Sequence, residues 1–414
     1  MHRFTYVFIL GVLYTPILLA QPVSDTLRLS EAIQQALQKH PLVQTAYWQT
    51  EVARGQVRQA GLWPNPVIEI EGEEWQSGRG IGTLYHRLSQ DILLGRKLNR
   101  QVQVARQNYK ATQYEAFAIQ LTVAEQLTQA YFNTLVARHR TRLAEQLAQL
   151  ANRLYETIAS MVEAGKLSPV EQQRVRVEKS RAEAQLLEAR QRYRIAWAQL
   201  AAALGKPSLP EMPLEDRVDT LSAPPDFAAL QQRLRAHPLL QQLEARQKTA
   251  LAMERLERAR RWPDLALTVG IQRLEGTPTR AFTGGIALPI PLFNRNQGAI
   301  QAARAAYQAT LEQWSSAHIS LETALQDAYR RLLATYQELQ LLREEMLPAA
   351  EQTYEAIRQG YQQGKFNMLD VLDSQRTFFE IRMQYLDVLQ QYHTARIQLQ
   401  ALTGELIPFT PTSN

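Results

Sequence analysis

The chain of 414 residues shows two hydrophobic periods, and the shorter one predicts β-strands. From Val67 to Trp75, glutamates alternate with apolar or small residues, which is typical of a strand with one polar and one apolar face. The glutamates are Glu69, Glu71 and Glu73, and they lie opposite Ile68, Ile70 and Gly72. A glycine-rich turn over 77–82 and a return strand over 85–92 complete a β-hairpin at about residues 66–92.

A second alternating segment begins at Leu265 and predicts a second hairpin at about residues 265–290. Its first strand places apolar residues on one face, namely Leu265, Leu267, Val269 and Ile271. The return strand does the same with Phe282, Gly284, Ile286 and Leu288. Each hairpin therefore has one apolar face.

The longer period predicts helices of unusual length after each hairpin. They extend over about 97–163 and 297–359, and only Pro348 interrupts the second. At 1.5 Å per residue, about 65 residues make a rod of roughly 100 Å. A return helix follows each, ending near Gly205 and Gly404, and apolar residues spaced four and three apart indicate coiled-coil packing. One such series is Leu325, Tyr329, Leu332, Tyr336 and Leu339.

The two halves of the chain repeat each other. Trp63-Pro64 returns as Trp262-Pro263 and Gly165-Lys166 as Gly364-Lys365, each 199 residues later. We therefore divide the chain into a signal peptide (1–20), a first repeat (21–205), a Pro-rich linker or side element (206–226), a second repeat (227–404) and a C-terminal tail (405–414). The resulting fold is mostly α with a small β part, built from duplicated long-helix coiled-coil hairpins and two β-hairpins.

Composition and charge limit the cellular compartment and the partners that we expect for this chain. A short basic start and an apolar run to Leu19 predict a secretory signal, and an uncleaved anchor is the alternative. No later segment has the roughly 18 consecutive apolar residues that a membrane helix needs, so if the mature protein spans a membrane, it does so with β-strands. The chain has no cysteine, which excludes disulfides and thiolate metal sites. Its net charge of +6 comes from basic residues interleaved with acidic ones, so we expect no nucleic-acid partner.

Four strands of this length suit a membrane but cannot close a barrel. An open sheet edge in lipid would leave backbone groups without hydrogen-bond partners. Several copies must therefore combine if the strands lie in a membrane, and three copies give twelve strands. We expect a homotrimer, in which an α-helical barrel continues a twelve-stranded transmembrane β-barrel.

Two phrases after the long helices resemble a known family. The first tip, residues 163–171, reads Glu-Ala-Gly-Lys-Leu-Ser-Pro-Val-Glu, and the second tip, residues 363–376, begins Gln-Gly-Lys-Phe-Asn-Met-Leu-Asp. With the signal peptide, the repeats and the Pro-rich middle, these phrases resemble the TolC-type outer membrane efflux family. The segments 62–71 and 88–97 are similar to its CzcC-like branch, which serves heavy-metal pumps.

The resemblance implies a passive exit duct in the bacterial outer membrane that reaches into the periplasm. It further implies a periplasmic adaptor (a membrane fusion protein), an inner-membrane RND-type pump that supplies the energy, and contact with outer-membrane lipid. Heavy-metal cations are the expected cargo, drugs or other small organic molecules are the alternative, and a periplasmic helical scaffold is a second alternative.

The resemblance also assigns a periplasmic gate. Asp370 and Asp373 match an aspartate pair that lines the family's constriction, Tyr361 matches a latch tyrosine, and Glu171 falls where its acidic partner would lie. Phe366 stands where well-known members have an arginine, so that latch cannot be transferred intact. The spacing itself allows two interpretations of the aspartates: a ring of carboxylates in a trimer, or acids that favour a helix start.

Two further sets of residues have alternatives of the same kind. Gly165, Lys166, Gly364 and Lys365 are expected adaptor-docking tips, although a glycine there is also an ordinary helix C-cap. Glu69, Glu71 and Glu73 are expected to line the barrel lumen, where they would favour cations or merely keep the lumen polar. We find no nucleophile with a base and no metal-ligand spacing, so we expect neither an enzyme nor a cofactor or resident metal.

Overall fold

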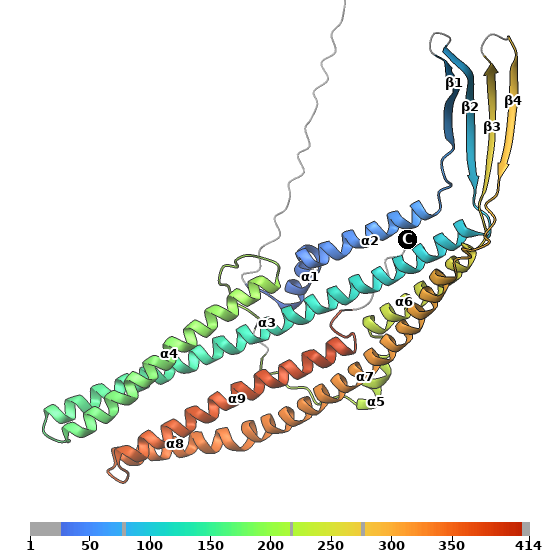
Figure 1. Cartoon of the computed structure of the whole chain (residues 1–414). Coiled ribbons are helices and arrows are strands. Elements are labelled where there is room, and N and C mark those ends of the chain that lie inside the picture. Colours follow the sequence, from blue (N-terminus) through green and yellow to red (C-terminus); the bar gives the residue numbers. More distant parts are fainter. Residues whose placement is uncertain (1–25, 77–79, 216–217, 275–277, 408–414) are drawn as a thin grey trace, which may run out of the picture.

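The protein is elongated in the computed structural model, with a β-sheet at one end and helical tips at the other (Figure 1). The structure describes residues 26–76, 80–215, 218–274 and 278–407. The expected signal peptide, the centres of both hairpin turns and most of the expected C-terminal tail lie outside these ranges.

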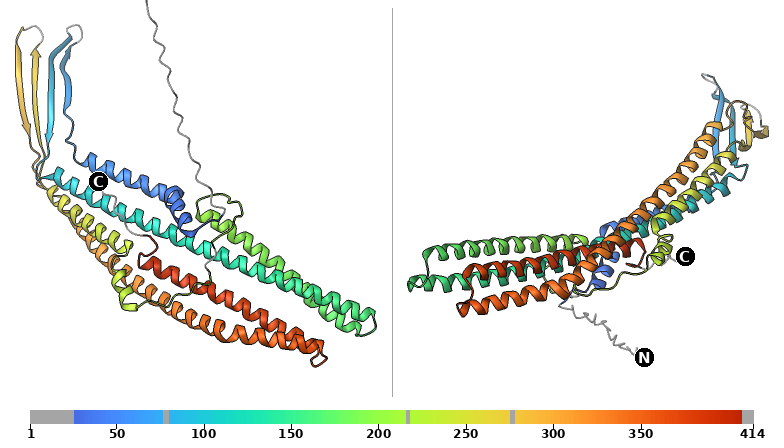
Figure 2. Two further views of the ribbon diagram at one scale, coloured as in Figure 1. Left: turned by 180° about the vertical axis from the view of Figure 1, so that it is seen from behind. Right: turned by 90° about the horizontal axis from the view of Figure 1, so that it is seen from below.

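The sheet contains β1 (Val67–Gln76), β2 (Gly80–Ile92), β3 (Leu265–Leu274) and β4 (Arg280–Ala287) in that spatial order, and all neighbours are antiparallel. Both predicted hairpins form, and β2 pairs with β3 to join them into one sheet. The outer edges of β1 and β4 have no partner strand among the described residues. The left view of Figure 2 shows the sheet extending beyond the helices.

Exposed apolar side chains gather on one face of the sheet. Opposite residues share a face, so the pairs Leu88↔Val269, Leu267↔Ile286 and Ile271↔Phe282 fix its composition. Among these six residues the exposed fraction runs from 38% at Ile271 to 88% at Phe282. An apolar sheet face open on this scale favours contact with lipid or another apolar surface.

Two long helical hairpins lead away from the sheet. The first is α3 (Lys97–Glu163) with α4 (Pro169–Ala203), and the second is α7 (Gln297–Leu341), η1 (Leu342–Met346) and α8 (Leu347–Gln362) with α9 (Met368–Leu402). Ser168 caps α4 by accepting from the Val170 N–H, and a proline occupies the first helical position.

The interruption predicted at Pro348 is a π-helical turn placed just before it. The N–H of Leu347 donates to the carbonyl of Leu342, five residues back. Ala105 and Gly165 are 60 residues apart, whereas the corresponding Ala303 and Gly364 are 61 apart. The π turn accommodates this additional residue. Pro348 follows it directly; because proline has no N–H, it could not donate an α-helical hydrogen bond at this position.

Four shorter helices complete the bundle: α1 (Leu29–Lys39), α2 (Pro41–Ala60), α5 (Phe227–Leu234) and α6 (Pro238–Ala259). His40 and His237 cap α2 and α6 by accepting from the next-but-one N–H at 3.2 Å. Helix α6 packs between α3 and α7, whereas α2 packs on α3 with its other side open.

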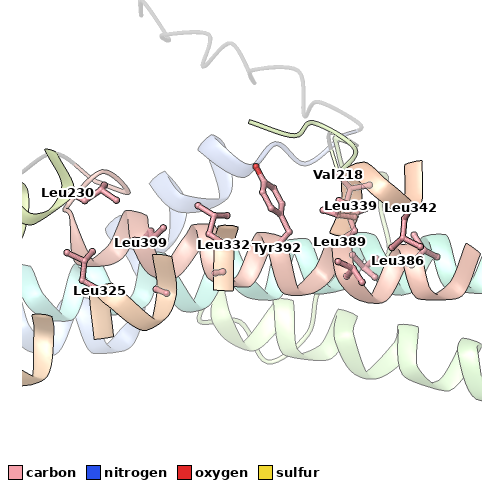
Figure 3. Packing of buried hydrophobic residues seen from close by; sticks show 14 of the residues in the cluster. Val218, Leu230, Leu325, Leu332, Leu339, Leu342, Leu386, Leu389, Tyr392 and Leu399 are labelled. Carbon is pink, nitrogen blue, oxygen red and sulfur yellow. The ribbon is translucent and has the colours of Figure 1, made fainter. Parts of the chain in front are cut away.

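The largest core lies where α3, α7 and α9 meet the linker (Figure 3). Leu325, Leu332 and Leu339 from the predicted coiled-coil series are buried in it. The described residues of the linker, 206–215 and 218–226, pack along the bundle: the Leu27 N–H donates to the Pro213 carbonyl at 2.9 Å, and Val218 is buried in this core.

Two side chains of α9 hold the linker. The Tyr392 hydroxyl donates to the Ser222 carbonyl at 2.8 Å and accepts from the Ser222 N–H at 2.9 Å. His393 Nε2 lies 2.7 Å from the Val218 carbonyl. The Pro-rich segment is thereby fixed to the helices at several points.

Candidate functional site at the helical tips

The two tips pack against each other at the end of the molecule remote from the sheet (Figure 1). Ile158 of α3 and Val175 of α4 form one cluster with Met368 and Val371 of α9. All four are buried, and Ile158 and Val175 are fully inaccessible. The structure therefore brings the predicted gate residues of both halves to one place.

Both tip turns have the same backbone geometry. Gly165 and Gly364 have φ of +69° and +72°, and the N–H of each donates to the carbonyl three residues back. The N–H of Lys166 and of Lys365 donates five residues back, at 2.9 and 2.8 Å, which completes a Schellman cap. Added Cβ atoms would meet nothing within 4 Å, so backbone conformation alone requires glycine here. Both lysines are exposed.

Asp370 belongs to the cap of α9. Its carboxylate accepts from the Asn367 N–H at 2.9 Å, while the Asn367 side chain accepts from the Asp370 N–H at 3.1 Å. This capping box is the helix-start role that the spacing left open. Asp373 lies one turn on, is exposed and pairs with Arg376 at 2.6 Å.

Both aspartates nevertheless line one groove of about 460 Å³ between α8 and α9. Ile357 and Ile381 contribute apolar walls to this groove. Capping and a charged groove are thus compatible, because a carboxylate that caps a helix still presents negative charge.

Tyr361 and Glu171, from opposite repeats, interact electrostatically. Burial and the negative charge of Glu171 raise the pKa of the Tyr361 hydroxyl. Glu171 pairs with Arg174 through Oε1 at 3.1 Å, whereas its Oε2 is shielded and has no hydrogen-bond partner among the described residues.

Phe366 has a packing role in this structure. Its ring lies on Gly360 of α8 so closely that a Cβ there would be 2.4 Å from Phe366 Cδ2. The arginine that the family resemblance would place at this position is thus replaced by an aromatic contact within the second tip.

The strand glutamates lie at the opposite end of the molecule, on the polar face of the sheet. Glu71 pairs with Arg87 of β2 at 2.5 Å, and the Tyr85 hydroxyl donates to Glu73 at 3.2 Å. Cross-strand partners therefore compensate part of the charge that the sequence places on this face.

Sequence reasoning missed an ion pair at the junction of sheet and helices. Lys97 Nζ lies 2.6 Å from Asp264 Oδ1, which also accepts from the Leu94 N–H at 3.0 Å. The Lys97 side chain is only 8% exposed. The phrases Gly-Arg-Lys and Trp-Pro-Asp carry the residues, but their proximity depends on the β2–β3 pairing.

A groove of about 500 Å³ between α3, α4 and α9 was also not predicted. It combines arginines with acidic and apolar side chains, among them Arg140, Arg181, Glu188, Phe379 and Asp387. Within the described ranges, no three His, Asp or Glu side chains are close enough to hold a metal ion. None of the helices in those ranges is long and apolar enough to cross a membrane.

The chain belongs to the outer membrane efflux protein family, whose model matches residues 32–206 and again 229–405. The two matches correspond to the two repeats, so each half is a copy of the family unit. The protein is accordingly an outer-membrane component of efflux systems.

Curated relatives include the cobalt-zinc-cadmium resistance protein CzcC of Cupriavidus metallidurans, 31% identical over 84% of this chain and 83% of that protein. The nickel-cobalt-cadmium resistance protein NccC of Alcaligenes xylosoxydans is 25% identical over 74% of this chain and 70% of its own. Among solved structures, the open MtrE channel of Neisseria gonorrhoeae superposes with a TM-score of 0.77 at 21% identity, covering 92% of this chain and 89% of that one.

Proposed function

We propose that the protein is the homotrimeric exit duct of a tripartite pump that exports heavy-metal cations. A twelve-stranded barrel of three sheets would span the outer membrane, and the helical hairpins would form a periplasmic tube that ends at the tips. The observation that carries the proposal is the position of the exposed apolar sheet face at one end and the acidic, glycine-turned tips at the other.

The cargo follows from relatives, because the printed names of CzcC and NccC refer to resistance to divalent metals. Groups that favour cations lie at both ends of the molecule, namely the strand glutamates and the Asp370–Asp373 groove. We therefore expect deletion to lower tolerance to cobalt, zinc, cadmium or nickel. If tolerance to organic drugs fell and tolerance to these metals did not, the small-molecule alternative would replace the metal assignment.

Asp370 and Asp373 are the proposed gate, with Tyr361 and Glu171 as a contact between the repeats. Purified protein in planar bilayers should give discrete conductance, and D370N with D373N should change its cation selectivity and its closed fraction. Asparagine still accepts the Asn367 N–H, so the capping box is preserved. The matched control is E312Q, which removes charge from an exposed position of α7 far from the tips.

The tips are the proposed contact with the periplasmic adaptor, which in turn would join an inner-membrane RND-type pump. Lys166 and Lys365 take part in their turns through backbone N–H groups only, so K166E and K365E should leave both turns intact. We expect these changes to reduce co-purification of the adaptor without loss of outer-membrane protein. Undiminished co-purification would place docking elsewhere.

A further inference from the structure

Two arginines lie directly opposite each other on the second hairpin. The register of β3 and β4 pairs Arg273 with Arg280, next to the pair Ile271↔Phe282. Both arginine side chains are exposed, and neither has an ion-pair partner in the described part of the chain. Opposite residues on neighbouring strands have Cβ atoms about 4.5–5.5 Å apart, so two positive charges there repel each other and destabilise the sheet.

The arginine pair belongs to the apolar face of the sheet. Residues two positions apart on a strand share a face, so Arg273 and Arg280 lie on the same face as Ile271 and Phe282. On its other side, Arg273 lies opposite Leu84 of β2. The glutamates of β1 lie on the opposite face, so they do not compensate this charge.

The pair also marks one boundary of that apolar face. Strand β3 ends and β4 begins at the end of the sheet remote from the helices (Figure 1). Eight residues separate Leu265, the first apolar residue of β3, from Arg273, which is about 26 Å along the strand and about 20 Å of height at a tilt of roughly 40°. The apolar band of a transmembrane β-barrel is about 25 Å tall. The charges therefore lie at the edge of such a band and not in its middle.

Protection of a free strand edge does not explain both charges. Charged residues on edge strands discourage wrong pairing, and Arg280 is on β4, whose outer edge is free among the described residues. Arg273, however, is on β3, which is paired on both sides. Two guanidinium groups that repel each other attract an anion placed between them, and phosphate fits because each guanidinium can donate two parallel hydrogen bonds to it.

We infer that Arg273 and Arg280 bind the phosphate group of a lipid in the outer leaflet of the outer membrane. A phosphate monoester carries nearly two negative charges at neutral pH, which matches the two guanidinium groups. Lipopolysaccharide, the lipid of that leaflet, carries such phosphates on its lipid A anchor. Its acyl chains would lie along the apolar face beside Phe282, which is 88% exposed.

This inference deepens the proposed duct by naming a lipid that it binds. It rests on the proposed function in one respect, namely that the sheet lies in the outer membrane with the start of β4 facing outwards. The binding itself can be measured on the purified full-length protein, so the site can fail while the duct stands.

The repulsion between the arginines gives a test whose sign depends on lipid. In lipid-free detergent, R273E turns a repelling pair into an ion pair with Arg280, so the unfolding temperature should rise above that of the natural protein. Bisphosphorylated lipid A should raise the unfolding temperature of the natural protein and leave that of R273E unchanged. Equal shifts by lipid A in both proteins would overturn the site.

Titration of lipid A in mild detergent, followed by native mass spectrometry, measures the affinity. We expect R273Q/R280Q to bind about a hundredfold more weakly, at about tenfold for each guanidinium removed. R273K/R280K should lie between the two, because an ammonium group keeps the charge but not the bidentate geometry. The matched control is R304Q/R330Q, which removes two exposed arginines from α7 and should bind like the natural protein.

Three further ligands identify the source of the phosphate. Dephosphorylated lipid A and inorganic phosphate should have no comparable effect, and phosphatidylglycerol, a diester with a single charge, should bind more weakly than lipid A. An equal effect of dephosphorylated lipid A or of inorganic phosphate would overturn the lipid-phosphate site. Equal affinity for phosphatidylglycerol would overturn the assignment to the outer leaflet.

The remaining outcomes separate this site from the proposed duct. Protein that conducts ions in planar bilayers, but whose affinity for lipid A is the same in R273Q/R280Q, would overturn the site and leave the duct intact. Loss of lipid A binding in R273Q/R280Q but not in R304Q/R330Q supports the site even if no conductance is found, in which case the duct alone is overturned.

Discussion

The ring of Phe366 covers Gly360 so closely that no other residue fits at position 360 without moving it. We expect G360A to displace the ring and lower stability by about 1–3 kcal/mol, as overpacking does. In an F366A background the sign should reverse, because alanine stabilises a helix interior over glycine by about 0.5–1 kcal/mol. Thermal unfolding of the four variants in detergent checks this, and the same sign in both backgrounds would contradict the contact.

The tip glycines should respond for a different reason. Gly364 has φ of +72° and open space around it, so G364A should cost about 1 kcal/mol from backbone strain alone. Gly55 lies in the middle of α2 with nothing within 4 Å, so G55A should stabilise by a similar amount. Opposite shifts in unfolding temperature are the expected result. Equal shifts would mean that the left-handed turn is not maintained.

Removal of the charge at Asp264 should show how much the Lys97–Asp264 pair, at the junction of sheet and helices, contributes to the free energy of unfolding. D264N leaves the Lys97 ammonium, whose side chain is 8% exposed, without its carboxylate; because the Asp264 side chain is 36% exposed, we expect a loss of about 1–3 kcal/mol. The control E188Q breaks the Arg192–Glu188 pair at 2.6 Å, whose side chains are 62% and 61% exposed, so it should change stability by less than about 1 kcal/mol. Denaturant titration of both variants measures the difference in the free energy of unfolding, and similar small losses would show that the Lys97–Asp264 pair contributes little.

Acid should loosen the linker through His393. The ring stacks on Phe132 at 4.2 Å, its Nδ1 is buried with no hydrogen-bond partner in the part of the chain that the structure describes, and burial lowers its pKa from 6.5 to about 4. Arg396 lowers this pKa further, while the Val218 carbonyl and Asp219 oppose the shift. The folded state thus favours neutral His393.

The resulting stability is complete above pH 6.5, and it is lost as pH falls from 6.5 towards 4. The loss should be about 3 kcal/mol. H393Q can still donate to Val218 but does not titrate, so its unfolding temperature should depend less on pH over this interval. An unchanged pH profile in H393Q would assign the dependence to other groups, among them His237, whose pKa burial also lowers to about 4.

The sequence predicted most of the fold because its signals are local and occur twice. The start and end of α3 follow from a helical pattern between a strand and a glycine turn, and the alternation of β1 is unmistakable. What it could not predict depends on residues far apart. Whether Lys97 meets Asp264 is decided by the β2–β3 pairing, and Phe366 could be seen as a departure from the family but not as a cover for Gly360.

The site illustrates the same limit. Spacing placed Asp370 and Asp373 on one helix face, and they do line one groove, but the reciprocal bonds with Asn367 depend on where α9 begins. The sequence already shows that the second long helix has one more residue than the first, because Ala303 and Gly364 are 61 residues apart and Ala105 and Gly165 are 60 apart. Only the backbone structure shows that this residue is accommodated in a π turn, because in the sequence the nearby Pro348 is the stronger indication of an interruption.

The open edges of β1 and β4 also have a consequence for biogenesis. In the proposed assembly, each exported chain would cross an aqueous compartment with two unpaired strand edges and an exposed apolar sheet face before other copies cover them, and such edges readily pair with wrong partners. Aggregation and mispairing are therefore most probable between secretion and assembly. The yield of folded protein in the cell will depend on how quickly the copies assemble and on whether chaperones bind the exposed edges first.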